Sequence, residues 1–102
     1  MPGTMASPSR WSVYLVLCAL DGSYYCGSTT NVARRVREHQ EGKGAKYTKG
    51  RLPVTLCFVH EVAGARSMAQ KVEAQIKRLT HAQKAELIKR PHAWAHLLEV
   101  VP

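Results

Sequence analysis

The chain has 102 residues, 45% of them hydrophobic, so it can form one small domain with one modest core and has no room for a second. Its 15 lysines and arginines outnumber 7 acidic residues, which gives a formal net charge of +8. This charge favours a polyanion over a neutral small molecule as the partner, with a basic protein whose lysines are merely solvated as the alternative.

Composition divides the chain into three parts. Residues 1–10 combine Pro, Ser and Gly with a single charge and no apolar run, so we expect a mobile tail and neither a signal peptide nor a membrane anchor. Residues 11–90 contain no linker and are expected to form the domain. Residues 91–102 are apolar enough to dock on its core as a C-terminal extension, mainly through Trp94, Leu97 and Leu98.

Three apolar segments are predicted to be strands. Residues 11–19, WSVYLVLCA, are continuously apolar and rich in β-branched and aromatic residues, which is typical of a central strand covered on both faces. Asp21-Gly22 is a two-residue hairpin signal, and residues 23–28, SYYCGS, then form the return strand. Residues 54–61, VTLCFVHE, form the third strand, with Pro53 at its edge.

A helix is predicted directly after the hairpin. Thr30 or Asn31 can cap it by accepting hydrogen bonds from its first amides, and the pattern VARRVREHQE runs to Gly42, which ends it. The following residues 42–53, GKGAKYTKGRLP, are rich in glycine and lysine and show no hydrophobic period, so a loop is expected there.

The last part of the domain is predicted to be helical. Residues 65–79 carry an apolar stripe at helical spacing, and Thr80 to Gln83 match a capping box that starts a second short helix through Lys89. The element order β-β-α-β-α-α predicts an α+β domain, in which a three-stranded, mostly antiparallel β-sheet is flanked by helices.

The cysteines indicate a reducing environment. They are odd in number, show no C-x-x-C spacing and lie in apolar runs, which favours buried thiols with no disulfide partner and a cytoplasmic protein. They are Cys18, Cys26 and Cys57.

Helical geometry places one arginine and one histidine of the first predicted helix near the sheet. At about 100° per residue, Arg35 and His39 fall within roughly 60° of the inward face. A cation near an apolar face indicates either a structural ion pair or an anionic ligand such as phosphate, and a satisfied, partly buried histidine is the alternative for His39. The charged residues expected to point to solvent are Arg34, Arg37, Glu38 and Glu41.

Two tyrosines of the predicted hairpin should share one face of the sheet. A two-residue turn would pair Tyr25 with Cys18, which lies on the same face as Tyr14. Tyr24 lies on the opposite face. Strand tyrosines are usually packing residues, so packing alone stays open as the role of each tyrosine.

Glu73 places a carboxylate at the margin of a core stripe, because it shares a side of its predicted helix with Ala69 and Ile76. Such a group is either an ion-pair partner or an oxygen ligand for Mg²⁺, an ion that takes only one or two carboxylates and keeps most of its waters.

Taken in order, these positions resemble those of the GIY-YIG nuclease superfamily, and most closely its small stand-alone bacterial proteins. Val13-Tyr14-Leu15 stands where the family has Gly-Ile-Tyr or similar, in a shifted reading that puts Tyr14 at the family's tyrosine, and Tyr25-Cys26-Gly27 stands for Tyr-Ile-Gly. Val13 in place of the family's first glycine and Cys26 in place of its usual aliphatic residue are departures at packing positions. The family's arginine, histidine and metal-binding glutamate are matched by Arg35, His39 and Glu73.

The resemblance, which covers residues 11–89, implies a metal-dependent DNA endonuclease that hydrolyses phosphodiester bonds with Mg²⁺, or with Mn²⁺ in its place. Tyr14 is then the general base, provided that nearby cations lower its pKa from about 10. Arg35 binds the scissile phosphate and Glu73 holds the metal. Tyr25 and His39 orient the water or the base, and Gly27 lets the backbone approach closely.

A basic segment next to this cluster is predicted to contact nucleic acid. Residues 34–51 contain seven basic residues against two acidic ones, with glycines and a tyrosine between them. A flexible basic loop suits a phosphate backbone, with a merely solvated loop as the alternative. The predicted contacts are Arg34, Lys43, Lys46, Tyr47, Lys49 and Arg51.

The predicted substrate is DNA, recognised by its structure or damage and not by its sequence, because so small a domain has little area for base readout. RNA stays open as a substrate, and no membrane contact is expected. A non-catalytic nucleic-acid-binding protein that retains the fold is the alternative. A basic structural or interaction domain ranks third, since it explains the charge but not the ordered Tyr, Tyr, Arg, His, Glu set.

Overall fold

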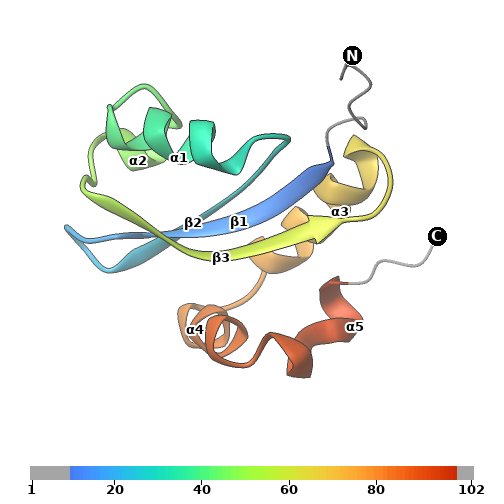
Figure 1. Ribbon diagram of the computed structural model, residues 1–102. Helices are drawn as coiled ribbons and strands as arrows, with labels where there is room; N and C mark the ends of the chain where they lie inside the picture. Colours follow the sequence, from blue (N-terminus) through green and yellow to red (C-terminus); the bar gives the residue numbers. More distant parts are fainter. Residues whose placement is uncertain (1–9, 99–102) are drawn as a thin grey trace, which may run out of the picture.

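A three-stranded antiparallel sheet forms the centre of the computed structural model, which describes residues 10–98 (Figure 1). Its strands are β1 (Trp11–Cys18), β2 (Ser23–Thr29) and β3 (Val54–Val62), in the order β2-β1-β3. β1 is therefore the central strand, as its unbroken apolar run predicted, and residues 13–16 are at most 1% exposed. The predicted α+β fold class is confirmed.

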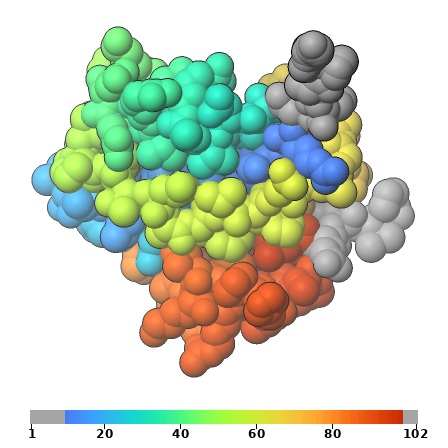
Figure 2. All heavy atoms as spheres, viewed as in Figure 1, coloured from blue at the N-terminus to red at the C-terminus, as the bar shows by residue number. Residues whose placement is uncertain are grey.

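Helices cover both faces of this sheet (Figure 1). One face carries α1 (Val32–Gln40) and the single turn α2 (Lys46–Lys49). The other face carries α3 (Arg66–Lys77), α4 (His81–Lys89), a 3₁₀ turn η2 (Pro91–Trp94) and α5 (Ala95–Leu98). The space-filling view shows the resulting layers, with α1 and α2 on one side of the strands and the C-terminal helices on the other (Figure 2).

The larger core lies on the α3 side of the sheet. Leu15 of β1, Phe58 of β3 and Ile76 of α3 meet there, and Leu87 and Leu98 close the cluster from α4 and α5. The cluster on the α1 side is smaller, and its buried members are Tyr14, Val16, Cys18 and Val54. The face that carries the tyrosine therefore contributes the lesser share of apolar packing.

The β1–β2 hairpin is paired two residues away from the predicted register. Tyr25 lies opposite Val16, and not opposite Cys18. Four residues separate the strands in place of the predicted two. The longer turn is stabilised by the Asp21 carboxylate, which accepts hydrogen bonds from the amide and the hydroxyl of Ser23 at 3.0 and 2.6 Å. A shift of two residues keeps every side chain on its face, so Tyr14 still shares a face with Tyr25.

The predicted helix caps are present. Asn31, one of the two candidate caps, accepts a hydrogen bond from the amide of Arg34 at 3.0 Å and begins α1. Beyond the end of α1, Gly42 adopts a φ of 75°, in the left-handed region that glycine tolerates best. Thr80 and Gln83 form the predicted capping box of α4.

Residues 42–53 are not the irregular loop that their composition predicts. Lys46–Lys49 form the turn α2, which begins after Ala45 and buries Thr48 completely against α1. The prediction of a loop is wrong at this point because a tertiary contact overrides weak local preference.

Residues beyond α4 pack on the larger core. Leu98 is 6% exposed, and Trp94 and Leu97 pack against the same cluster. Residues 1–9, which make up most of the expected N-terminal tail, and residues 99–102 of the expected extension lie outside the described residues. No helix within residues 10–98 has the length and apolar character that crossing a membrane requires.

The three cysteines are unpaired thiols with low reactivity. Cys18 and Cys26 are buried and Cys57 is half-buried. Burial raises the pKa of Cys26 to about 12 and that of Cys57 to about 11, so both thiols stay protonated at neutral pH.

Tyr24→Phe should leave the stability unchanged. Tyr24 lies on the α4 face and stacks on His81 with ring centroids 4.7 Å apart, a contact that phenylalanine keeps. We expect the free energy of unfolding, measured with urea, to change by less than about 0.5 kcal/mol. Tyr14→Phe is the matched control and should cost about 1–3 kcal/mol, because it leaves a buried imidazole without its partner. Equal losses would contradict the strand faces described above.

Candidate active site

A buried hydrogen bond joins the tyrosine of β1 to the histidine of α1. The hydroxyl of Tyr14 lies 2.7 Å from Nε2 of His39, and the two residues are 1% and 0% exposed. Val36, one turn before His39 on α1, packs on the same sheet face and holds the helix over the tyrosine. The histidine therefore points toward the sheet, as helical geometry indicated.

Tyr25 completes an aromatic cluster around this hydrogen bond. Its ring centroid lies 6.5 Å from that of Tyr14 and 5.3 Å from that of His39, which it meets edge-on. Tyr47 of α2 stacks on Tyr25 at 5.9 Å, with 28° between the ring planes. The four rings come from β1, β2, α1 and α2, so the cluster forms only when the hairpin and the basic segment fold together.

Arg35 lies beside the Tyr14 hydroxyl with 31% of its side chain exposed. Its Nη1 donates a hydrogen bond to Oε1 of Glu38 at 3.1 Å, in an i,i+3 pair on α1. Glu38, which was expected to point to solvent, keeps 35% of its side chain exposed and also lies 3.7 Å from Nε of Arg34. A guanidinium carries five N–H donors, so the bond to Glu38 fixes its position and leaves donors for an anion.

Burial keeps both members of the Tyr14–His39 pair uncharged at neutral pH. It raises the pKa of Tyr14 to about 12, although the neighbouring Arg35 acts in the opposite direction. The expectation that nearby cations lower the pKa of Tyr14 is therefore contradicted, because the effect of burial on this pKa is larger than the opposing effect of Arg35. The pKa of His39 is lowered from the ordinary value of 6.5, first by burial and then by Arg35.

Two glycines make room for this pair. Gly27 lies opposite Tyr14 in the sheet, and a Cβ atom there would lie 2.6 Å from the tyrosine hydroxyl oxygen. A Cβ atom at Gly44 would overlap the His39 ring. Neither position can carry a side chain unless the hydrogen-bonded pair moves.

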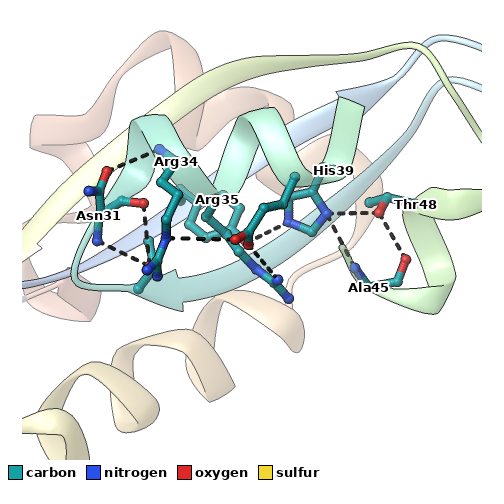
Figure 3. Close-up of polar contacts among 9 residues, drawn as sticks. Asn31, Arg34, Arg35, His39, Ala45 and Thr48 are labelled. Carbon is teal, nitrogen blue, oxygen red and sulfur yellow. Dashed lines mark hydrogen bonds and ion pairs between the residues drawn. The ribbon is translucent and has the colours of Figure 1, made fainter. Parts of the chain in front are cut away.

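Thr48 holds the far side of the imidazole. Its hydroxyl oxygen lies 2.8 Å from Nδ1 of His39 and 3.0 Å from the carbonyl oxygen of Ala45, and the residue is 0% exposed (Figure 3). Together with Tyr14 on the other nitrogen, it gives the buried ring a polar partner at each end.

Glu73 approaches from the other side of the sheet. It belongs to α3, 18% of its side chain is exposed, and its Oε1 accepts a hydrogen bond from the hydroxyl of Ser28 at 2.7 Å. Ser28 follows Gly27 in the edge strand β2, so its side chain points to the opposite face. Within residues 10–98, no hydrogen bond or ion pair joins this carboxylate to the group formed by Tyr14, Tyr25, Arg35 and His39.

A lysine contacts the second oxygen of Glu73. Nζ of Lys77 lies 2.7 Å from Oε2, in an i,i+4 pair on α3. The pKa of Lys77 is raised by this hydrogen bond, and more weakly by Tyr25 and Cys26 of β2. The edge of β2 thus has a tyrosine on one face and a carboxylate with its ammonium partner on the other.

Glu73 fits a metal ion that takes few protein ligands. Among residues 10–98, no group of three or more His, Cys, Asp or Glu side chains could hold an ion. A single carboxylate suits Mg²⁺, which keeps most of its waters and binds substrate phosphate. Lys77 is 52% exposed on a flexible stem, so it can give up Oε2 to such an ion.

Four predicted nucleic-acid contacts face solvent. Lys46 and Lys49 are exposed on α2, and the side chains of Lys43 and Arg34 are 76% and 55% exposed. Their ion pairs, with Glu41 at 4.0 Å and Glu38 at 3.7 Å, are long and exposed, so they are weak. These four cations are available to an external phosphate backbone.

Arg51 and Tyr47 are more firmly held. Nε of Arg51 lies 3.0 Å from Oδ2 of Asp21, and its guanidinium lies 3.9 Å from the centroid of the Tyr47 ring. Nη1 of Arg51 also donates to the Tyr47 carbonyl oxygen at 2.9 Å. Tyr47 is 38% exposed. These contacts tie the basic segment to the hairpin loop, so both residues also have a structural role.

Three polar residues that support the site, Ser28, Glu38 and Thr48, were not predicted from the sequence. Strand alternation could have placed Ser28 on the α3 face, and i,i+3 spacing could have paired Glu38 with an arginine. No pattern in residues 42–53 marks Thr48, because its partner reaches it only through tertiary folding.

Comparison with known proteins establishes the family. The model of the GIY-YIG catalytic domain matches residues 10–86. This chain belongs to the GIY-YIG family. It is 47% identical over 81 residues, 79% of each chain, to the UPF0213 protein VC_A0739 of Vibrio cholerae. It is also 47% identical over 88 residues, 86% of each chain, to the UPF0213 protein YhbQ of Salmonella typhimurium.

A solved structure agrees with this assignment. The solution NMR structure of the protein EF2693 from E. faecalis is 42% identical, with a TM-score of 0.55 over 85% of this chain and 90% of that one. The resemblance carried by the ordered Tyr, Tyr, Arg, His and Glu set is confirmed at the level of the family. GIY-YIG proteins form a nuclease family, which acts on nucleic acid and generally uses divalent metals.

Gly27→Ala should destabilise the protein by about 1–3 kcal/mol, because the added methyl group must displace the Tyr14 ring. Gly50→Ala is the matched control, since nothing lies within 4 Å of a Cβ atom there and its φ is −94°. Urea denaturation compares the two variants, and the control should stay within about 0.5 kcal/mol of wild type. A Gly27→Ala protein as stable as the control would argue against the close approach.

Proposed function

We propose that this protein is a metal-dependent endonuclease that hydrolyses phosphodiester bonds in DNA. The observation that carries the proposal is the buried hydrogen bond between Tyr14 and Nε2 of His39, with the Arg35 guanidinium beside it. Hydrolysis needs a base for the attacking water, positive charge at the phosphate and charge stabilisation at the leaving oxygen. Tyr14 with His39, Arg35 and Glu73 are proposed to meet these three needs in turn.

Tyr14 and His39 act on the water as a two-residue proton relay. With a pKa of about 12, only ~10⁻⁵ of Tyr14 is ionised at pH 7, so a preformed phenolate is too rare to be the base. The hydroxyl of Tyr14 passes its proton to Nε2 of His39, 2.7 Å away, while its oxygen takes a proton from water. The water oxygen bonds to phosphorus, and the bond from phosphorus to the 3′ oxygen breaks.

Arg35 binds the scissile phosphate and stabilises the charge that develops on it. Its side chain is 31% exposed, and Glu38 fixes its position by binding Nη1. The remaining N–H donors of the guanidinium are proposed to bind the phosphate. Tyr25, in edge contact with His39, orients the water or the relay. Gly27 lets the Tyr14 hydroxyl lie against the backbone of β2, since a Cβ atom there would lie 2.6 Å from the hydroxyl oxygen.

Glu73 is the residue that would hold the metal, with Mg²⁺ the proposed ion and Mn²⁺ a substitute. When bound, a divalent metal neutralises the negative charge on the leaving 3′ oxygen. Ser28 orients the carboxylate through Oε1 and keeps it at the edge of β2.

The basic surface beside the cluster tracks the DNA backbone. Its proposed contacts are Arg34, Lys43, Lys46, Tyr47, Lys49 and Arg51. They are cations and one aromatic ring, which suit phosphates and the face of a base, and so small a domain leaves little area for base readout. The proposed substrate is therefore DNA with a particular structure or lesion. The three high-pKa thiols fit a reducing compartment, so we assign the protein to the cytoplasm.

A non-catalytic nucleic-acid-binding protein is the second candidate. Two observations favour it: the pKa of Tyr14 is raised, and both oxygens of Glu73 already have partners within the protein. It ranks below the endonuclease because it gives no role to a tyrosine–histidine hydrogen bond kept in a buried site.

Arg35→Ala and Glu73→Gln should each abolish metal-dependent cleavage while the protein stays folded, because both side chains are proposed to act on substrate or metal. The measurement uses end-labelled single-stranded, duplex, flapped and four-way-junction DNAs with Mg²⁺ or Mn²⁺, and EDTA should stop all cleavage. We expect each variant to lose at least ~10²-fold in rate.

Arg37→Ala is the matched control, since it removes an exposed arginine from the same helix and should cleave like wild type. A variant that keeps full activity would remove its residue from the mechanism. Wild-type protein that shifts every DNA in a gel but cuts none would favour the non-catalytic candidate.

Lys46→Ala combined with Lys49→Ala should weaken DNA binding and reduce the slope of log K against log salt by about 2, because each lysine is proposed to neutralise one phosphate. Fluorescence anisotropy over a series of salt concentrations measures this slope. Lys71→Ala combined with Lys89→Ala removes the same charge from α3 and α4 as a control. A larger effect in the control would place the DNA on those helices.

A further inference from the structure

Thr48 is a buried polar residue to which membership of the family assigns no role. It is 0% exposed on α2, a turn whose other three residues are exposed. Its hydroxyl oxygen contacts two atoms, Nδ1 of His39 at 2.8 Å and the carbonyl oxygen of Ala45 at 3.0 Å (Figure 3). These two contacts decide which nitrogen of the imidazole carries the proton.

The direction of each hydrogen bond follows from counting hydrogens. A carbonyl oxygen can only accept, so the single hydrogen of the Thr48 hydroxyl must lie between Oγ1 and the Ala45 oxygen. Oγ1 can then only accept from the imidazole, which requires a hydrogen on Nδ1 of His39. In a neutral ring this leaves a lone pair on Nε2, and the Tyr14 hydroxyl donates to it at 2.7 Å.

One contact favours the opposite arrangement. The amide nitrogen of Ala45 lies 3.4 Å from Nδ1 and would donate to it if that nitrogen carried no hydrogen. This distance is long for a hydrogen bond, whereas the bond that the Thr48 hydroxyl donates to the Ala45 carbonyl oxygen measures 3.0 Å. The shorter of these two directed contacts favours a hydrogen on Nδ1.

We propose that Thr48 is a positioning residue that holds His39 as the Nδ1–H tautomer, so that Nε2 is kept as the proton acceptor for Tyr14. The tautomer is a property of the folded protein alone, and its use in catalysis rests on the proposed endonuclease function. With a hydrogen on Nε2 instead, the imidazole would donate to the tyrosine oxygen and could not receive its proton.

The surroundings of His39 keep the ring neutral for this role. The titratable and charged groups that face it are Tyr14 from β1, Tyr25 from β2, and Arg35 and Glu38 from α1. Arg35 disfavours the imidazolium and Glu38 favours it, with burial as the larger effect against charge. A neutral ring has one hydrogen to place, which is why a single hydroxyl can decide where it goes.

The test compares Thr48→Val, which keeps the shape and removes the hydroxyl, with Thr48→Ser, which keeps the hydroxyl. Nitrogen-15 NMR of the imidazoles at pH 8 reads the tautomer, and His39→Gln assigns the His39 signals by their loss. We expect a protonated Nδ1 and an unprotonated Nε2 in wild type and in Thr48→Ser. In Thr48→Val the Ala45 amide is the remaining partner of Nδ1, so the hydrogen should move to Nε2.

Cleavage rates provide the second measurement. Thr48→Val should lower kcat by about 10²-fold with KM unchanged, and Thr48→Ser should restore most of the rate. A merely structural role would change stability without moving the tautomer. Wild-type His39 with its hydrogen on Nε2 would overturn the proposal, and so would a Thr48→Val protein with wild-type tautomer and rate.

These outcomes separate the inference from the proposed function. Wild-type protein that cuts no DNA, yet has the Nδ1–H tautomer that Thr48→Val reverses, would count against the endonuclease and support the positioning role of Thr48. If Thr48→Val does not fold, the wild-type and Thr48→Ser tautomers decide the question.

Discussion

The candidate site depends on keeping one polar pair, Tyr14 and His39, buried and mutually hydrogen-bonded. A buried phenol or imidazole without a hydrogen-bond partner would lower the stability of the fold by about 1–3 kcal/mol. The neighbouring elements must therefore leave space for both rings and keep them within hydrogen-bond distance. Gly27 and Gly44 leave the room, since a Cβ atom at either position would meet one of the two rings. The apolar packing that compensates for a polar face comes from the larger core on the α3 side of the sheet.

The edge strand β2 joins the two halves of the site. Its side chains alternate, so Tyr25 and Gly27 face the aromatic cluster while Ser28 faces α3 and binds Glu73. Side chains on opposite faces of a central strand could not serve one substrate. At an edge they can, and the proposed function places the phosphate backbone along β2, with Arg35 on one face and the Glu73 carboxylate on the other.

The turn α2 carries both exposed cations and a residue that contacts the buried Tyr14–His39 pair. Lys46 and Lys49 are exposed, Tyr47 stacks on Tyr25, and Thr48 contacts His39 from within the same four residues. Arg51 and Asp21 fasten the end of the segment to the hairpin loop. Lys49 is adjacent to Thr48 in the chain and Lys46 lies two residues before it, so the exposed cations and the hydroxyl that contacts His39 belong to one turn.

Periodicity in the sequence determined the three strands, the helices α1, α3 and α4, and the faces on which Tyr14, Tyr25, Arg35 and His39 lie, because alternation and helical spacing are local properties of the chain. The ordered motif likewise determined the family. Local pattern could not give the hairpin register, which an Asp21 hydrogen bond shifted by two residues, nor the pKa of Tyr14, which depends on the atoms that displace water around it. Thr48 is the clearest case. Only tertiary packing brings its hydroxyl to His39, since no local pattern in residues 40–47 between them specifies that contact.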